Sequence, residues 1–270
     1  MLDAHPELTI PPETHFLPRV IRACRHGASP ERVAHVAARH RRWDDFGIER
    51  EQYLDRLRQI DPLEAGPAIR AFYELYAARA GKPRWGDKTP GYAVKMRRIQ
   101  RALPEARFIH LIRDGRDVVL SQARKSERPL PVEVAAKRWK RRVAATRKRS
   151  EGVDHYTELR YEDLVTDPEA ALRRVCELIE LRFDPAMLAY HEHATERLEE
   201  IDRELPARRG HRRLEAGPRI AAHGRASQPP APERAGAWRT EMPPADQAAF
   251  QEVAGDLLAE LGYEQALGSG

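Results

Sequence analysis

The segment that most constrains the fold is a short apolar run at residues 108–112, Phe-Ile-His-Leu-Ile. Its length and branched side chains favour a strand buried on both faces, as in a parallel sheet. The run stops at Arg113-Asp114-Gly115, and apolar residues then recur at helical spacing as far as Gln122. A strand that turns directly into a helix is typical of α/β proteins, in which ligands bind at the carboxyl ends of the strands.

Helical periodicity dominates the rest of the chain. It runs through the first 80 residues, and Thr89-Pro90 has the composition of a helix start. A second, weaker strand is predicted at residues 156–160. Further helices are predicted at residues 131–149, from Thr166-Asp167-Pro168, from Asp184-Pro185 and at residues 250–261.

Residues 203–234 interrupt this pattern, because they are rich in Arg, Pro and Gly and show little periodicity. We interpret them as a mobile loop rather than a linker between domains. No internal repeat is visible. We therefore expect residues 1–270 to form a single, helix-rich α/β domain.

Composition excludes several classes of protein. Hydrophobic residues make up 41% of the chain, which is enough to form a core, so a fully disordered chain is excluded. No run approaches the roughly 20 apolar residues of a membrane span. The two cysteines form no disulfide framework or zinc motif, so we expect no metal. No signal peptide is visible, and we expect a cytoplasmic protein. A formal charge of +5 hints at anionic ligands without naming one.

Arg113 and Ser121 form the first candidate site. Arg113 ends the predicted strand, and Ser121 lies eight residues further on, two turns into the predicted helix. An arginine and a hydroxyl near a helix N-terminus are suited to bind an anion. An arginine after a strand is as often an ordinary solvated residue, so both interpretations stay open on these residues alone.

The stretch FIHLIRDGRDVVLS resembles the 3′-phosphate-binding motif of sulfotransferases that use 3′-phosphoadenosine 5′-phosphosulfate (PAPS). Four further segments resemble that family in the same order, and together they cover most of the chain: MLDAHPELTIPPETHFL, WGDKTP, LRYEDLVTDPEAALRRVCELIEL and GAWRTEMPPADQ. Within the family, the pattern is most similar to tyrosylprotein sulfotransferases and their bacterial relatives. The resemblance implies a P-loop-NTPase-like parallel sheet flanked by helices.

The resemblance also implies roles for individual residues. Glu13 matches the general base and Lys88 a cation at the reacting centre, while Arg113, Ser121 and Tyr161 match positions that bind PAPS or its product, 3′-phosphoadenosine 5′-phosphate (PAP). Without the resemblance, Glu13 reads as an ordinary acidic residue at a helix N-terminus, and Lys88 as a solvated lysine.

Neighbouring residues offer alternatives for the same roles. His15 is an alternative base, and Asp87 is expected to orient Lys88 or to pair with an arginine. Trp238-Arg239 resembles a donor-contacting position, although a tryptophan there is equally suited to the core.

The family's N-terminal phosphosulfate loop, of the form PRSGTT, has no counterpart in the sequence, and GxxxxGK[ST] and GxGxxG loops are absent as well. We expect that the first strand and its loop are missing, more through truncation of the reading frame than through natural loss. We accordingly expect poor stability and little or no transfer activity from residues 1–270 alone.

Residues 137–149, KRWKRRVAATRKR, carry eight Lys and Arg residues on a predicted helix. The simplest interpretation is a solvated basic face, and the functional one is a surface that attracts an anionic acceptor such as an acidic peptide, a glycan or a small molecule. The sequence thus favours a PAPS-dependent sulfotransferase acting on a hydroxyl or amine. A catalytically silent nucleotide- or anion-binding protein and a basic polyanion-binding module remain alternatives. We expect no nucleic-acid partner.

Overall fold

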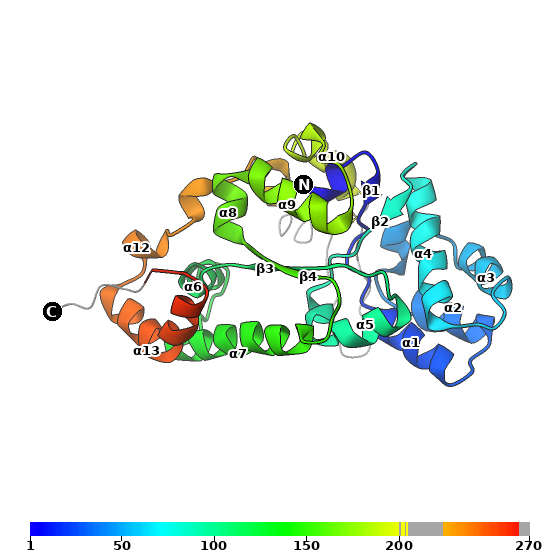
Figure 1. The fold of residues 1–270 in the computed structure, drawn as a ribbon, viewed down its shortest axis with the longest axis horizontal. Coiled ribbons are helices and arrows are strands. Elements are labelled where there is room, and N and C mark those ends of the chain that lie inside the picture. The colour runs from blue at the N-terminus through cyan, green and yellow to red at the C-terminus, as the bar shows by residue number, and fades with distance from the viewer. Residues whose placement is uncertain (200, 203, 205–223, 265–270) are drawn as a thin grey trace. The chain divides into compact units, whose positions relative to one another are not determined.

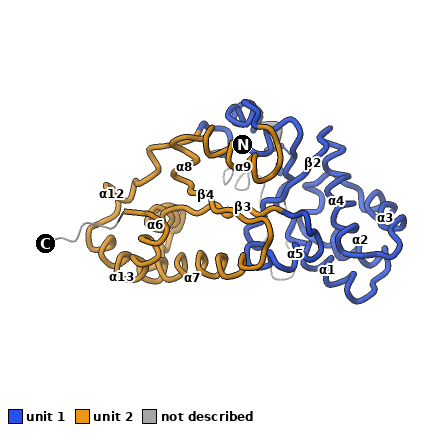
Figure 2. Tube along the Cα trace, in the orientation of Figure 1, with its two compact units in different colours: residues 1–106, 183–229 blue, residues 107–182, 230–270 orange. Residues whose placement is uncertain are grey.

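The computed structural model describes residues 1–199, 201–202, 204 and 224–264. The chain divides into two compact units, shown in Figure 2. Unit 1 comprises residues 1–106 and 183–229, and unit 2 comprises residues 107–182 and 230–270. The single domain over residues 1–270 stays a prediction.

Helices make up most of unit 1 (Figure 1). Its α-helices are α1 (Leu17–Arg25), α2 (Pro30–Ala38), α3 (Arg50–Arg58), α4 (Ala65–Arg79), α5 (Met96–Ala102) and α10 (Ala194–Glu199). Its 3₁₀ helices are η1 (Leu2–Ala4), η2 (Trp43–Phe46), η3 (Pro90–Lys95), η4 (Pro185–Met187) and η5 (Gly224–Ser227). The predicted helical character of the first 80 residues is thus confirmed, and Thr89 precedes a helix as predicted.

An aromatic cluster forms the core of unit 1. Phe72 on α4 is fully buried, and its ring packs edge-on against Phe16 and Phe46 at centroid distances of 4.7 and 5.1 Å. Trp43 and Tyr53 pack on the same ring at 5.6 and 6.1 Å. Aromatic pairs of this kind each contribute about 0.5–1.5 kcal/mol beyond area burial, so they fasten α4 to the segments around it.

Unit 1 also contains a two-stranded parallel sheet, whose second strand lies at the start of the WGDKTP segment. Strand β1 (Leu8–Thr9) pairs with β2 (Arg84–Trp85), in the register Leu8 to Arg84 and Thr9 to Trp85. The sheet places the segments that follow its two strands next to each other. Those segments carry Glu13 and Lys88.

Unit 2 begins with the predicted strand and the helix that follows it. Its elements are β3 (Phe108–Ile112), α6 (Gly115–Ala123), α7 (Val132–Ser150), β4 (Tyr156–Arg160), α8 (Tyr161–Thr166), α9 (Pro168–Ile179), η6 (Pro232–Arg234), α12 (Trp238–Glu241) and α13 (Pro244–Glu260). The Asp167 carboxylate accepts the Ala170 N–H at 3.1 Å, which confirms the predicted start of α9. Asp184-Pro185, in contrast, starts only the short η4.

Strands β3 and β4 pair in parallel over five residues, from Phe108 opposite Tyr156 to Ile112 opposite Arg160. The prediction that residues 108–112 are buried on both faces is wrong. Ile112 is buried, but Leu111 is 49% exposed. Successive side chains of a strand point to opposite faces, and the face that carries Leu111 stays partly uncovered.

Helices α6, α7 and α13 enclose the core of unit 2. Gly115 opens α6 where no side chain fits, because a Cβ there would lie 2.5 Å from the Trp139 ring on α7 and would also overlap Phe250 on α13. This close approach brings the turn after β3 directly onto the core.

Part of the predicted loop at residues 203–234 lies outside the described residues, namely residue 203 and residues 205–223. Within the described part of that segment, η5 and η6 are short 3₁₀ helices. None of the helices in the described part of the chain is both long and apolar enough to cross a membrane.

Candidate functional site

The predicted site residues fall into two clusters, one in each unit. In unit 1, Lys88 Nζ lies 2.7 Å from Glu13 Oε1, so the predicted base and the predicted cation are direct partners. Two residues meet the other carboxylate oxygen: His15 Nε2 lies 3.0 Å and Arg42 Nη1 3.3 Å from Glu13 Oε2. Sequence reasoning missed Arg42, because no motif marks an arginine 29 residues away.

These contacts fix the charge of Glu13. The hydrogen bond from His15 is the largest influence, and with Lys88 and Arg42 it outweighs the opposing effect of burial and lowers the Glu13 pKa to about 2. The side chain of Glu13 is 20% exposed and that of Lys88 60%. The cluster is therefore an ionised carboxylate held among cationic and hydrogen-bonding groups at the protein surface.

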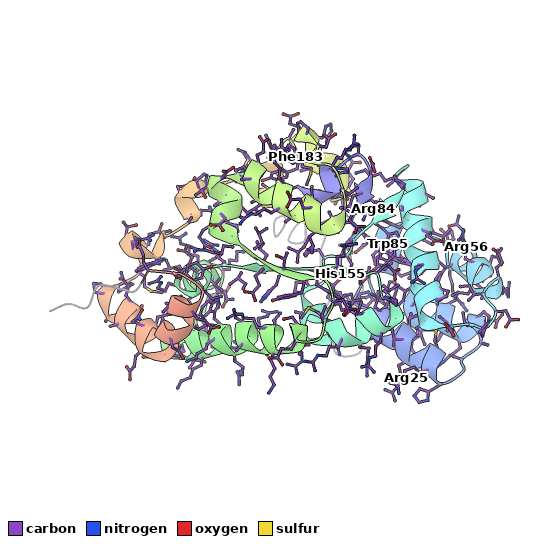
Figure 3. The ribbon with its side chains drawn as sticks, viewed as in Figure 1. Arg25, Arg56, Arg84, Trp85, His155 and Phe183 are labelled. Carbon is purple, nitrogen blue, oxygen red and sulfur yellow. The ribbon has the colours of Figure 1, made fainter. Side chains whose placement is uncertain are left out.

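A buried network of hydrogen bonds lies next to this cluster. Thr14 Oγ1 and Tyr73 Oη each donate to Asp87 Oδ2 at 2.7 Å, and the Thr14 N–H donates to Thr89 Oγ1 at 3.0 Å. Tyr73 also stacks on Trp85 of β2, with ring centroids 4.3 Å apart and planes 9° from parallel; Trp85 is labelled in Figure 3.

The expectation that Asp87 orients Lys88 or pairs with an arginine is wrong, since its hydrogen bonds go to Thr14 and Tyr73. Burial raises the pKa of Asp87 against these hydrogen bonds. The network ties the segment that carries Glu13 to the segment that carries Lys88.

In unit 2, Arg113 lies at the carboxyl end of β3 as predicted. Its guanidinium covers the Tyr161 ring at 4.6 Å from the centroid, and its Nη2 donates to the Arg234 carbonyl at 2.9 Å. Its Nε is buried and has no hydrogen-bond partner among the described residues. An unsatisfied guanidinium N–H at the end of a parallel strand fits an anionic group such as a phosphate.

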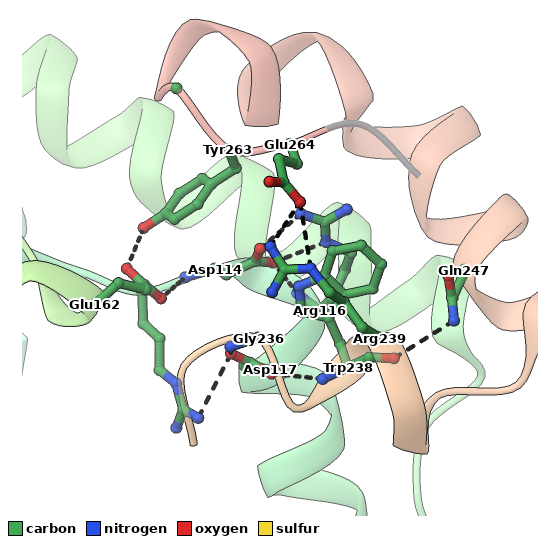
Figure 4. A network of polar contacts seen from close by, with 12 residues as sticks. Asp114, Arg116, Asp117, Glu162, Gly236, Trp238, Arg239, Gln247, Tyr263 and Glu264 are labelled. Atoms are coloured by element: carbon green, nitrogen blue, oxygen red, sulfur yellow. Dashed lines mark hydrogen bonds and ion pairs between the residues drawn. The ribbon is translucent and has the colours of Figure 1, made fainter. Parts of the chain in front are cut away.

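Asp117 on α6 binds the C-terminal segment to this turn (Figure 4). Its carboxylate accepts the N–H groups of Gly236 and Trp238 at 2.8 and 2.9 Å, and Arg113 Nη2 lies 3.8 Å away. Burial raises the pKa of Asp117, while the two backbone hydrogen bonds oppose that rise. Sequence reasoning missed this anchor, because its partners are backbone groups more than 100 residues away.

A second ion pair supports the same turn. Arg116 is fully buried, binds the Asp114 carboxylate through Nε and Nη2, and packs over the Trp238 ring at 3.4 Å (Figure 4). Trp238 is therefore a core residue, which supports the alternative given for it above. Arg239 pairs with Glu264 at 2.7 Å.

Of the residues predicted to bind the donor, Arg113 and Tyr161 are in contact. Ser121 lies on α6, half-buried, and no hydrogen bond joins it to Arg113 among the described residues. Within the same part of the chain, no group of three His, Cys, Asp or Glu residues is placed to hold a metal ion.

Known structures identify the fold. A sulfotransferase domain from the curacin biosynthetic pathway superposes with a TM-score of 0.58 at 18% identity, covering 98% of this chain and 92% of that chain. A sulfotransferase domain from the Synechococcus PCC 7002 olefin synthase gives 0.57 at 22% identity, covering 98% and 89%. The fold is therefore that of sulfotransferase domains, which confirms the predicted class: helix-rich α/β, P-loop-like, with parallel strands.

Sequence comparison agrees. The model of the sulfotransferase family matches residues 1–185, and the chain belongs to that family. A candidate protein-tyrosine sulfotransferase of Caenorhabditis briggsae is 26% identical over 77% of this chain and 69% of its own length. Protein-tyrosine sulfotransferase 1 of Danio rerio is 24% identical over 71% of this chain. The match spans only 51% of the zebrafish protein. Family and fold together support sulfuryl transfer as the general chemistry.

Proposed function

We propose that this protein transfers a sulfuryl group from PAPS to a hydroxyl or amine acceptor and releases PAP, with Glu13 as part of the group that acts as the general base. The observation that carries the proposal is the family match over residues 1–185, which contains all five predicted site residues. The two contacts described above support it, Glu13 with Lys88 and Arg113 with Tyr161.

Sulfuryl transfer resembles phosphoryl transfer, in which catalysis is mostly positioning and electrostatic stabilisation. Lys88 is suited to stabilise negative charge that develops on a departing oxygen, because its ammonium is exposed and Glu13 is its one partner in the described part of the chain. We expect Lys88→Ala to lower kcat by about 10²–10³-fold. Lys125→Ala, at an exposed position on the turn after α6, serves as the control.

For the acceptor we propose a peptide with acidic residues around the modified side chain. Relatives named as protein-tyrosine sulfotransferases support a peptide. The acidic character of the proposed peptide is supported by a groove of about 420 Å³. The groove lies along α1, the helix directly after the segment that carries Glu13. Its lining contains the basic residues Arg19, Arg22, His26 and Arg32 and the apolar residues Ala23, Ala28 and Val36.

Calorimetric titration with PAP tests the nucleotide site. We expect Arg113→Ala to weaken PAP binding by about 10–150-fold, because a hydrogen bond to a charged group contributes about 1.5–3 kcal/mol. Arg141→Ala, an exposed arginine of α7 in the same unit, should leave the affinity unchanged. Equal PAP affinity for the wild type, Arg113→Ala and Arg141→Ala would show that Arg113 takes no part in PAP binding. Absence of PAP binding to the wild type would show that this chain has no nucleotide site.

Transfer is measured with PAPS and tyrosine-containing acidic peptides, both for residues 1–270 and for a chain extended through in-frame codons upstream of Met1. Transfer by either chain supports the proposal. PAP binding without transfer by both chains supports the silent nucleotide-binding protein instead. Polyanion binding without PAP binding supports the basic interaction module.

A further inference from the structure

The carboxylate of Glu13 is a strong acceptor and a weak base. Both of its oxygens are occupied, Oε1 by Lys88 at 2.7 Å and Oε2 by His15 at 3.0 Å. With a pKa lowered to about 2, it has little affinity for a proton near neutral pH. General bases work best when their pKa lies near the working pH. The imidazole of His15 is the neighbouring side chain that contacts Glu13 and that can accept a proton.

The contact between the two residues fixes the tautomer of His15. An ionised carboxylate only accepts hydrogen bonds, so the proton of a neutral imidazole must lie on Nε2, the nitrogen 3.0 Å from Glu13 Oε2. Nδ1 then carries the lone pair, and among the described residues no hydrogen bond reaches it. The His15 side chain is 37% exposed against 20% for Glu13, so the imidazole is the more accessible of the two.

The backbone holds His15 in this position at a cost. His15 has φ of +55°, in the left-handed region that non-glycine residues rarely adopt. The segment is tied down on both sides: Thr14 is bound by Asp87 and Thr89, and the Leu17 N–H donates to the Tyr92 hydroxyl at 3.1 Å. Backbone strain that the surroundings enforce is concentrated at functional sites.

The charged groups around His15 come from several segments. Glu13 contacts it directly, the buried Asp87 interacts with it electrostatically, and the His40 ring packs against it with ring centroids 5.4 Å apart. Burial, together with the charges of His15, Arg19 and Arg42, lowers the pKa of His40 to about 3, so His40 is neutral at physiological pH. Lys88 and Arg42 both pair with the Glu13 carboxylate.

We propose that Glu13 and His15 act as a pair, in which His15 Nδ1 takes the acceptor's proton and Glu13 positions the imidazole. This deepens the proposed function and rests on it. The acceptor's O–H bond breaks and its oxygen forms a bond to sulfur, while the bond from sulfur to the donor's phosphate oxygen breaks and its electron pair leaves with that oxygen. The proton ends on His15 as imidazolium, which the Glu13 carboxylate stabilises.

The pH dependence of kcat/KM separates the two possible bases. If His15 takes the proton, kcat/KM has a limb that falls towards acid pH, because a protonated imidazole cannot accept a second proton. If Glu13 takes it directly, kcat/KM stays level down to pH 5, because the Glu13 pKa is about 2. We expect His15→Gln to lower kcat by about 10²–10⁴-fold and to remove this limb. Glu13→Gln should lower kcat and retain the limb.

A matched control and a readout independent of activity complete the test. His193→Gln, at an exposed position, should keep both the rate and the limb of the wild type. Long-range ¹H–¹⁵N NMR of residues 1–270 near pH 8 should show the His15 proton on Nε2, and this assignment should be lost in Glu13→Gln.

The outcomes distinguish this inference from the function on which it rests. A transferring wild type with a level profile, or His15→Gln with the wild-type rate, overturns the role of His15 and leaves the function standing. A proton on Nδ1 overturns the inference whatever the activity. Absence of transfer from both chain lengths overturns the proposed function and this inference with it.

Discussion

Two carboxylates of unit 1 show how neighbouring groups and burial set the pKa of an acidic side chain. Glu13 and Asp87 lie on neighbouring segments, yet their pKa values shift in opposite directions. Three cationic or hydrogen-bonding side chains lower the pKa of Glu13, whereas burial raises that of Asp87. The first carboxylate therefore stays ionised in acid, and the second is a structural acceptor for hydroxyl groups.

The pH dependence of stability should report the state of Glu13. Its pKa is about 2 in the folded protein, against 4.5 as the ordinary value, so its contribution is fully present above pH 4.5 and is lost as the pH falls towards 2. We expect the difference in unfolding free energy between wild type and Glu13→Gln, measured in urea, to shrink between pH 6 and pH 3. Glu177→Gln, on the exposed face of α9, should show no such change. A constant difference would contradict the lowered pKa.

The buried network around Asp87 should be costly to break. Asp87→Ala leaves the hydroxyls of Thr14 and Tyr73 without their acceptor, so we expect a loss of about 1–3 kcal/mol in unfolding free energy. Asp87→Asn should lose less, because its amide keeps one acceptor oxygen. Asp55→Ala removes an exposed partner of Arg58 and should cost about 0–1 kcal/mol. Equal losses at Asp87 and Asp55 would contradict a structural role for the network.

Sequence reasoning identified Glu13 and Lys88 through resemblance, and the structure places them in contact. It could not find Arg42, whose relation to Glu13 depends on the packing of η2. It also misassigned the partners of Asp87. A carboxylate beside a lysine in sequence suggests an ion pair, but alternation along an extended segment points neighbouring side chains in opposite directions.

At the scale of elements, two predictions agree closely with the structure. The strand at residues 156–160 and the helix over residues 131–149 agree with β4 and α7 to within a residue. Strands β1 and β2 are two residues each, too short to show alternation. The exposure of Leu111 could not be predicted either, because it depends on what covers β3 rather than on the strand's own composition.

Helix α6 can pack closely against α7 and α13 because the residue at the contact, Gly115, has no side chain. Gly115→Ala would place a methyl group against Trp139 and Phe250, so we expect a loss of about 1–3 kcal/mol in unfolding free energy. Gly91→Ala, at a helical position with no atom within 4 Å of the new Cβ, should be close to neutral. Thermal or urea unfolding compares the two variants. Similar stabilities would show that α6 can shift to admit the methyl group.

At the scale of the whole molecule, the charge of +5 is unevenly compensated. On α7, Lys140 pairs with Asp256 and Arg147 with Glu158. Several other basic residues of this helix are exposed and form no ion pair with any described residue, and four of them lie close together: Lys137, Arg138, Arg141 and Arg142. We call these four the basic face of α7. Clustered charge attracts polyanions more strongly than the same charge dispersed, and salt screens that attraction.

Chromatography on heparin tests whether this clustering matters. Changing the four residues of the basic face to Gln lowers the net charge from +5 to +1, and we expect elution at clearly lower salt, with PAP affinity unchanged. A control with the same net charge changes four dispersed, exposed residues to Gln: Arg50, Arg98, Lys125 and Arg128. It should elute between the wild type and the first variant, because dispersed charges attract heparin only through the net charge of the protein. Elution of both variants at the same salt would show that the basic face is ordinary solvated surface.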